Sequence, residues 1–430
     1  MSGTAIARVH ARRVWDSRGR PTVEAEVTLE GGAMGRAIAP AGASRGAREA
    51  VDLRDGGTRF GGFGVDRAVA NVVGPIAGAL AGLDACNQFA IDTTLIHLDG
   101  TPNKARLGGN ATVAASLAVA QAAAAARGVP LWRSVAGNDD VTLPLPEIQI
   151  FGGGAHASRA LDLQDLMVMP IGATAFADAI AMVAEIYRAA GSLMADAGTL
   201  AGVADEGGYW PAFTTNEEAL ATLTRAIERA GFRPGIDAAL SLDVAASELQ
   251  RDGRYTLALE QRTLDCDQMT RMFIDWLDRY PIASIEDPFG EDDIDGWAGF
   301  ARAAAGRVQI VGDDFLTTNA TRVAQAASDA SCNAVLIKVN QAGTLTEAKA
   351  ALDAGKRAAF GTIVSARSGE TEDVAIAHLA VGWNAGQLKV GSFARGERTA
   401  KWNEVLRIEE SLGGAAHYAG AGALPRVRNR

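Results

Sequence analysis

The sequence is poor in cysteine, in long apolar runs and in net positive charge, and each shortage excludes a class of protein. Its 430 residues include three scattered cysteines, an odd number that argues against a disulfide framework and a spacing that fits no cysteine metal site. No apolar stretch is long enough to cross a bilayer, and Met1–Thr4 lacks the apolar core of a signal peptide. The formal net charge of −10 makes nucleic acid and anionic membranes unexpected partners. We therefore expect a cytoplasmic protein.

The first 137 residues predict a small α+β domain. Partial alternation of apolar residues over 6–14 and 23–27, with a Gly31-Gly32 turn, indicates strands. A small-residue loop follows at 39–46, and its composition leaves open whether it is a connector or a lid. Helical patterns cover Asp66–Leu80 and the alanine-rich Asn110–Arg127. We place the domain boundary near Gly137, so that residues 1–137 form one domain and 138–430 a second.

From Leu143 onwards the pattern predicts an α/β barrel. Two strands, 145–151 and 161–170, precede two helices, 176–197 and 216–231, and strands and helices then alternate to the end of the chain. The further helices are expected at 265–280, 293–305, 320–330, 346–357, 373–382 and 398–412. The second domain therefore begins with two strands followed by two helices (ββαα), which departs from strict βα order. The remainder fits a parallel (β/α)8 barrel.

Short apolar runs of this second domain repeatedly end in a charged residue, which is costly for a buried strand unless the charge is used or paired. The residues concerned are Asp243, Glu286, Asp313, Lys338 and Lys389. Three carboxylates at neighbouring strand ends suit Mg²⁺, although a salt-bridge network with the two lysines is the alternative. A lysine beside a dication should have a lowered pKa, which makes Lys338 a candidate general base. Lys389 is either an ion-pair partner or a clamp on an anionic substrate.

Three loops carry further candidates. Glu206 lies in a glycine-rich loop, where it is either an acid with a raised pKa or a solvated turn residue. His156 follows three consecutive glycines, a weak signal on its own. Arg367 and Ser368 follow an apolar strand and precede a helix, which fits a phosphate site, unless the arginine pairs with Glu370 or Glu372 instead.

With these segments identified, the chain resembles the enolase (phosphopyruvate hydratase) family over essentially its whole length. The resemblance implies an enolase-type barrel behind an α+β capping domain, and it implies a homodimer or higher homo-oligomer. The matching stretches, in chain order, are Asp16-Ser17-Arg18-Gly19, Gly42-Ala43-Ser44, Asp205-Glu206-Gly207-Gly208-Tyr209, Ser284-Ile285-Glu286-Asp287, Gly312-Asp313-Asp314, Leu336-Ile337-Lys338, Arg367-Ser368-Gly369-Glu370-Thr371-Glu372-Asp373 and Arg407-Ile408-Glu409-Glu410.

The resemblance also implies a role for each site residue. Lys338 would remove the proton α to the substrate carboxylate, and Glu206 would protonate the leaving hydroxyl. The site would hold two Mg²⁺ ions, the first on Asp243, Glu286 and Asp313, and the second with help from Ser44 on a mobile loop. Together with Lys389 the metals would stabilise the enolate intermediate. Arg367 and Ser368 would bind the phosphate, while His156 and Gln164 would line the pocket.

The sequence departs from the family pattern in this same pocket. Ala366 stands where enolases carry a histidine, Asp165 replaces a glutamate near the leaving hydroxyl, and Arg45 replaces a threonine after Gly-Ala-Ser. Ala41, Gly152 and Ala155 are further replacements in the surrounding loops. The groups that make the enolate are kept, whereas several that surround the departing hydroxyl are changed.

Three functions follow from this combination. The first is a Mg²⁺-dependent lyase that converts 2-phosphoglycerate to phosphoenolpyruvate. The second is an enzyme of phosphonate natural-product biosynthesis, such as a carboxyphosphonoenolpyruvate synthase, since Ala366 removes bulk and Arg45 adds a cation suited to a larger anion. The third is a non-catalytic relative, which the intact metal-type acids argue against.

Overall fold

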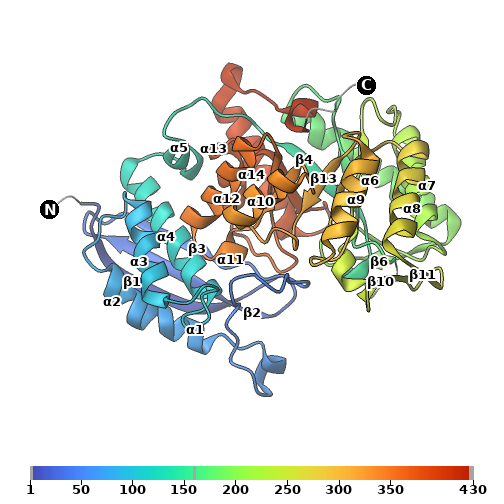
Figure 1. Ribbon diagram of the computed structural model, residues 1–430. Coiled ribbons are helices and arrows are strands. Elements are labelled where there is room, and N and C mark those ends of the chain that lie inside the picture. The colour runs from blue at the N-terminus through green and yellow to red at the C-terminus, as the bar shows by residue number, and fades with distance from the viewer. Residues whose placement is uncertain (1–2, 158–160, 426–430) are drawn as a thin grey trace.

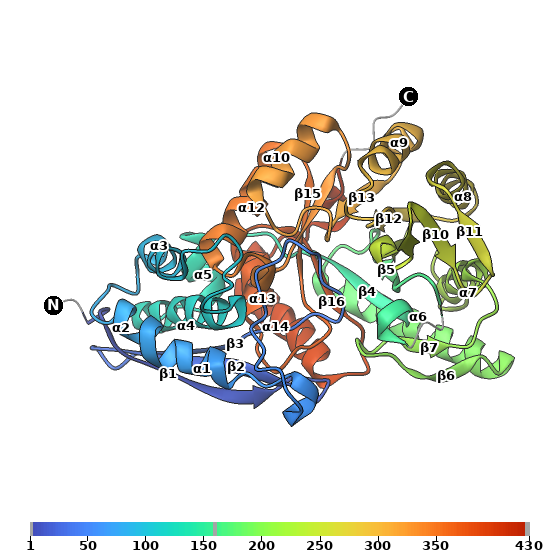
Figure 2. The same cartoon turned by 60° about the horizontal axis from the view of Figure 1, so that its bottom comes forward.

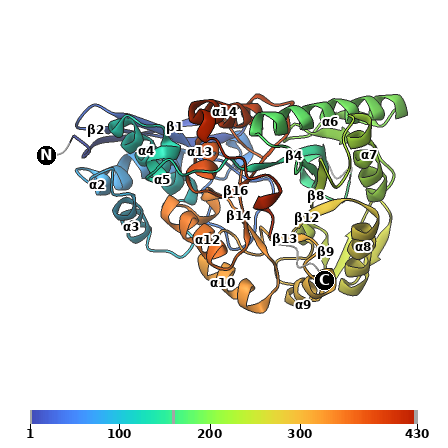
Figure 3. The ribbon, with the colours of Figure 1, turned by 90° about the horizontal axis from the view of Figure 1, so that it is seen from above.

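The computed structural model describes residues 3–157 and 161–425 and contains a small antiparallel sheet beside a closed barrel (Figure 1). The sheet is a meander of β1 (Ile6–Trp15), β2 (Pro21–Leu29) and β3 (Met34–Ile38). Beyond the two expected strands it includes β3, which follows the predicted Gly31-Gly32 turn. Figure 3 shows this sheet and its helices on one side of the barrel.

The helices of this first part cover the sheet. They are α1 (Asp66–Asn71), α2 (Ala77–Leu80), α3 (Gln88–Asp99), α4 (Gly109–Arg127) and α5 (Leu131–Ala136). The helix expected over 66–80 is interrupted by a π turn, Val72–Ile76, which contains Pro75 and so lacks one backbone donor. The alanine-rich α4 packs so closely on the sheet that a Cβ on Gly35 would lie 2.1 Å from the Ala122 nitrogen.

Eight strands close into the barrel, which confirms the predicted fold class. In chain order they are β4 (Leu145–Gly152), β5 (Asp165–Met169), β8 (Ala239–Asp243), β12 (Ile282–Glu286), β13 (Gln309–Gly312), β14 (Ala334–Ile337), β15 (Gly361–Ser365) and β16 (Gly386–Gly391). Pairing of β16 with β4 completes the ring. The irregular start is confirmed too, because β5 runs antiparallel to both β4 and β8 while the other neighbours are parallel.

Helices surround the barrel where the sequence predicts them, with bounds that differ by a few residues. They are α6 (Phe176–Ala197), α7 (Asn216–Arg229), α8 (Cys266–Arg279), α9 (Ile294–Ala304), α10 (Ala320–Asp329), α12 (Leu345–Arg357), α13 (Ala375–Gly382) and α14 (Gly396–Leu412). One short turn, α11 (Val339–Ala342), follows β14 directly. Within the described residues, no helix is long and apolar enough to span a membrane.

Two short sheet elements lie beside the main strands. The pair β6 (Leu200–Val203) and β7 (Tyr209–Pro211) extends the barrel sheet at β4, and β9 (Gln250–Arg251), β10 (Arg254–Leu257) and β11 (Arg262–Leu264) form a separate small sheet. The β6–β7 turn is important for the site because it carries Glu206.

A long loop from the first part of the chain crosses the open end of the barrel. This segment, residues 39–58, connects β3 to the helical region and passes over the strand ends in Figure 2, where it is drawn in blue. Ala41 and Gly369 exchange backbone hydrogen bonds of 2.9 and 2.8 Å. The loop is therefore attached to the segment that follows β15.

Candidate active site

The carboxyl ends of the parallel strands bring the predicted charged residues to one mouth. Asp243 and Glu286 end β8 and β12 and lie opposite each other in the ladder, while Asp313 and Lys338 directly follow β13 and β14. Asp165 opens β5, and because that strand runs antiparallel its first residue lies beside Asp243. Parallel pairing thus explains why residues far apart in sequence meet here.

Two lysines lie among these carboxylates. The Lys389 Nζ is 2.9 Å from Asp243 Oδ2, 2.8 Å from Glu286 Oε2 and 3.8 Å from Asp165 Oδ2. The Lys338 Nζ donates to Asp313 Oδ2. The salt-bridge network considered from the sequence therefore exists in this structure.

Nearby carboxylates set the charge of Lys338. Burial is the largest single effect and lowers the pKa of Lys338, but Asp313 and then Glu286 raise it, and the resulting pKa lies above its ordinary value. The sequence-based expectation that the pKa of Lys338 is lowered assumed a divalent cation next to the lysine. Engagement of Asp313 by such an ion would remove the attraction that keeps Lys338 protonated.

The acids fit a divalent cation because one buried oxygen lacks a partner. Glu286 is 1% exposed, and its Oε1 makes no hydrogen bond with any described residue. Burial, followed by the nearby Asp243, raises the pKa of Glu286 well above its usual range. A carboxylate with a free buried oxygen between two further acids has the donor chemistry that Mg²⁺ requires.

Another acidic group lies next to the predicted ligands but is used by the backbone. Ligating atoms of Asp287, Asp313 and Asp314 lie within 4.8 Å of one another. The two Asp287 oxygens accept the backbone N–H groups of Asp313 and Asp314 at 2.9 and 2.8 Å. Asp287 therefore orients the Asp313 backbone, while Asp313 itself contacts Lys338 and Gln341.

A buried histidine organises the other wall of the site. His156 Nδ1 lies 2.9 Å from Asp165 Oδ1, and its Nε2 lies 3.0 Å from Ser368 Oγ and 3.6 Å from Glu206 Oε1. Burial lowers the pKa of His156, but Asp165 and Glu206 outweigh it and raise the pKa to about 9. The same pair lowers the pKa of Asp165 to about 2 against the opposing effect of burial. At neutral pH this wall therefore carries an imidazolium.

The Arg367 side chain is held mainly by the 39–58 loop and not by Glu370 or Glu372, the alternative partners considered from the sequence. Its guanidinium donates to Glu49 Oε2 at 2.9 Å, to Asn340 Oδ1 at 3.1 Å and to the Ser44 carbonyl at 3.0 Å. Glu370 instead accepts the Arg367 backbone N–H at 3.0 Å. The position of the Arg367 guanidinium is thus fixed by the loop that crosses the mouth and by Asn340 of α11.

These groups surround one cavity of ≈ 20 Å³, which is room for roughly one water molecule. Most of the predicted residues line it: Ser44, His156, Gln164, Asp165, Glu206, Asp243, Lys338, Arg367, Ser368 and Lys389. Three predicted residues, Glu286, Asp313 and Arg45, are not among the lining residues. The Arg45 guanidinium instead pairs with Asp52 at 3.0 Å. A substrate contact by Arg45 therefore stays a prediction that requires movement of the loop.

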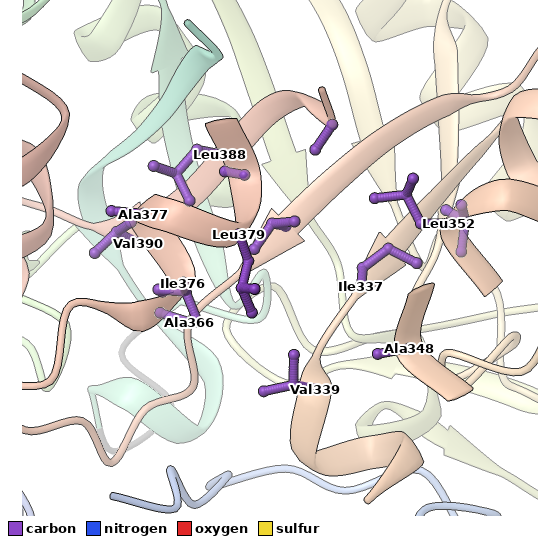
Figure 4. Close-up of a cluster of buried hydrophobic side chains, with 14 of the residues drawn as sticks. Ile337, Val339, Ala348, Leu352, Ala366, Ile376, Ala377, Leu379, Leu388 and Val390 are labelled. Carbon is purple, nitrogen blue, oxygen red and sulfur yellow. The ribbon is translucent and has the colours of Figure 1, made fainter. Parts of the chain in front are cut away.

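Ala366 forms an apolar part of the lining. It is 6% exposed and belongs to the main hydrophobic core, together with Val390 and Ile376. Figure 4 shows these side chains in one buried cluster. A histidine at position 366 would place a polar ring at this wall, so its absence leaves His156 as the imidazole among the lining residues.

The sequence interpretation missed three buried residues that support the site. Gln149 donates to Asp165 and accepts the Gly208 N–H at 2.7 Å, which joins the Glu206 turn to the barrel. Glu49 binds Arg367, and Glu147 lies inside β4. Glu147 and Gln149 were detectable as polar residues at alternate positions of an otherwise apolar strand, whereas Glu49 lies in a loop without a pattern.

The fold and this site define a barrel lyase of the enolase superfamily. The family model described as enolase, N-terminal domain, matches residues 6–135, and the one described as enolase, C-terminal TIM barrel domain, matches residues 140–426. The chain therefore belongs to the enolase family.

Proposed function

We propose that the protein removes the proton α to a carboxylate and eliminates water from 2-phosphoglycerate, which gives phosphoenolpyruvate. The observation that carries this proposal is the placement of Lys338 and Glu206 around one cavity, with Asp243 and Lys389 beside them. Lys338 comes from the end of β14, and Glu206 comes from the turn that adjoins β4. A base and an acid thus reach the substrate from separate parts of the ring.

In this proposal each residue moves or holds a defined group. Neutral Lys338 takes the C2 proton, the C2–C3 double bond forms, and the C3–O bond breaks as Glu206 gives its proton to the departing hydroxyl. Lys389 binds the substrate carboxylate, and Arg367 with Ser368 and the His156 imidazolium binds the phosphate. Asp243, Glu286, Asp313 and Ser44 would hold Mg²⁺, which supplies positive charge where negative charge develops on the carboxylate.

The proposal is tested by mixing the purified chain with 2-phosphoglycerate and Mg²⁺ and following the absorbance of phosphoenolpyruvate. We expect turnover that is abolished by a chelator and reduced by Lys338→Met by about 10²–10⁴-fold, which is the usual contribution of a positioned base. Turnover that survives Lys338→Met would contradict the assigned base.

A second candidate is an elimination on a phosphonate relative of this substrate, and the altered wall at Ala366 and Asp165 favours it. Asp165 is one methylene shorter than glutamate and is engaged by His156, Gln149 and Lys389. The Ala366 side chain is apolar and offers no hydrogen bond to a substrate.

The double variant Asp165→Glu with Ala366→His separates the two candidates. If the wild type turns over 2-phosphoglycerate poorly and the double variant gains about tenfold or more, the changed wall serves another substrate. If the wild type is already efficient and the double variant gains nothing, the phosphonate candidate is excluded.

A further inference from the structure

The barrel interior contains a buried acid that the proposed chemistry does not use. Glu147 lies on β4, is 1% exposed and belongs to a strand whose every residue is buried. Its Oε2 accepts a hydrogen bond of 2.8 Å from Ser241 Oγ on β8. Its Oε1 has no hydrogen-bond partner among the described residues, which is costly for a polar atom at this depth.

Glu147 is directly opposite Lys389. The ladder between β16 and β4 pairs the two residues, and neighbouring strands lie about 4.8 Å apart with paired side chains on the same face. Ser241, the partner of Glu147, precedes Asp243 by two residues on β8 and so shares its face. Glu147 therefore lies beside Lys389 on the neighbouring strand, on the face that Ser241 and Asp243 share.

Engagement of a cation would change the charges around Lys389. The lysine now balances Asp243 and Glu286, the same two acids that a divalent ion would take. The charged Lys389 that the proposed function requires would then be buried without these two partners and close to a dication. Of the acids that face it, Asp165 is 3.8 Å away and is already paired with His156.

We propose that Glu147 is a positioning residue that balances the charge of Lys389 when a divalent cation engages Asp243 and Glu286. This inference rests on the metal site of the proposed function. It assigns to Glu147 no contact with substrate or metal. It explains why an acid with an unpartnered oxygen is kept inside the barrel at the register position of Lys389.

The charged groups that face Glu147 support this role. Burial raises the pKa of its carboxyl, Lys389 and the Ser241 hydroxyl lower it, and Asp243 raises it further. A cation on Asp243 would cancel the last effect, and release of Lys389 from its acids would strengthen the second. Both changes favour the carboxylate form of Glu147 when a cation engages Asp243 and Glu286.

The test is a calorimetric titration of Mg²⁺ into the full chain, with Glu147→Gln compared with wild type. Glutamine keeps the shape and can still accept from Ser241 but cannot become negative, so we expect Mg²⁺ to bind at least about fivefold more weakly. Glu185→Gln, which removes a charge from the exposed face of α6, is the matched control and should bind as wild type does.

A second readout separates this role from a structural one. The unfolding free energy without Mg²⁺ should be unchanged or higher in Glu147→Gln, because a buried acid is replaced by a neutral group. If that variant does not fold, Glu147→Met, which is apolar and of similar volume, should show the same loss of affinity. Wild-type Mg²⁺ affinity in either folded variant would overturn the inference, whereas a wild type that binds no Mg²⁺ would overturn the proposed metal site as well.

Discussion

At the scale of single residues, the charged strand ends could be predicted from the sequence. A charged residue at the end of a buried apolar strand is costly unless the charge is paired or used, so it marks a site. Asp243, Glu286 and Lys338 all lie where a barrel strand ends. A salt-bridge network with the two lysines was one of the two predictions for these acids, and it is present. Contacts that join a loop to a strand could not be predicted, because they depend on which side chains reach each other in the fold. The link between His156 and Asp165 is an example: it joins a short 3-10 turn to the start of an antiparallel strand.

The His156 pair predicts a pH-dependent stability. The pKa of His156 rises from 6.5 to about 9 on folding, so its stabilising contribution is fully present below about 6.5 and is lost as the pH rises through about 9. His156→Gln should therefore lower the unfolding free energy by on the order of 3 kcal/mol near pH 6 and by much less at pH 9.5. Denaturant unfolding at both values measures this, and an equal loss at the two pH values would contradict the ion pair.

At the scale of elements, the long amphipathic helices and buried strands were predicted well, because periodicity over many residues is a strong signal. The short strands β6–β7 and β9–β11 were missed, since two to four residues carry too little pattern. Helix α3 was missed as well. Residues 39–46 of the 39–58 loop were predicted to be a connector or a lid, and the family resemblance implied a mobile loop that carries Ser44. Its contacts with Arg367 and Gly369 show that it covers the mouth in this structure.

Close approach of this loop requires glycine at position 42. A Cβ there would lie 2.0 Å from the Arg367 Nη2 and 2.6 Å from the Ser44 carbonyl oxygen. Gly42→Ala should therefore displace the loop or the guanidinium and lower kcat/KM for 2-phosphoglycerate by about tenfold or more. Gly299→Ala, where a Cβ meets open space on α9, is the control. Equal kcat/KM of the two variants would show that the close approach of the loop at Gly42 does not affect catalysis.

At the scale of the whole molecule, the small sheet domain and the barrel are joined by buried polar contacts that no local pattern predicted. Asp92 of α3 is fully buried and accepts from the Thr346 backbone N–H at 2.8 Å and its hydroxyl at 2.6 Å. Thr346 lies in the first turn of α12 on the barrel, where a carboxylate is favoured by the helix dipole. Such a contact depends on tertiary structure and leaves no sequence signature.

Replacement of Asp92 should lower the free energy of unfolding of the whole molecule. Asp92→Ala leaves the donors of Thr346 and of Ser116 without their acceptor, and we expect it to lower the unfolding free energy by about 2–4 kcal/mol. Asp353→Ala, which breaks a partly exposed pair with Lys349, should cost less than about 1 kcal/mol. Equal effects in denaturant unfolding would show that the junction is not held through Asp92.

The central claim is that Lys338 removes a proton from the carbon next to a carboxylate, and hydrogen exchange at that carbon tests it most directly. In D2O with Mg²⁺, nuclear magnetic resonance of 2-phosphoglycerate should show loss of the C2 hydrogen signal in the presence of the wild type, alongside any phosphoenolpyruvate formed. The Lys338→Met variant should leave the signal intact. A C2 signal that persists with the wild type, or one that is lost equally with the variant, would contradict the account.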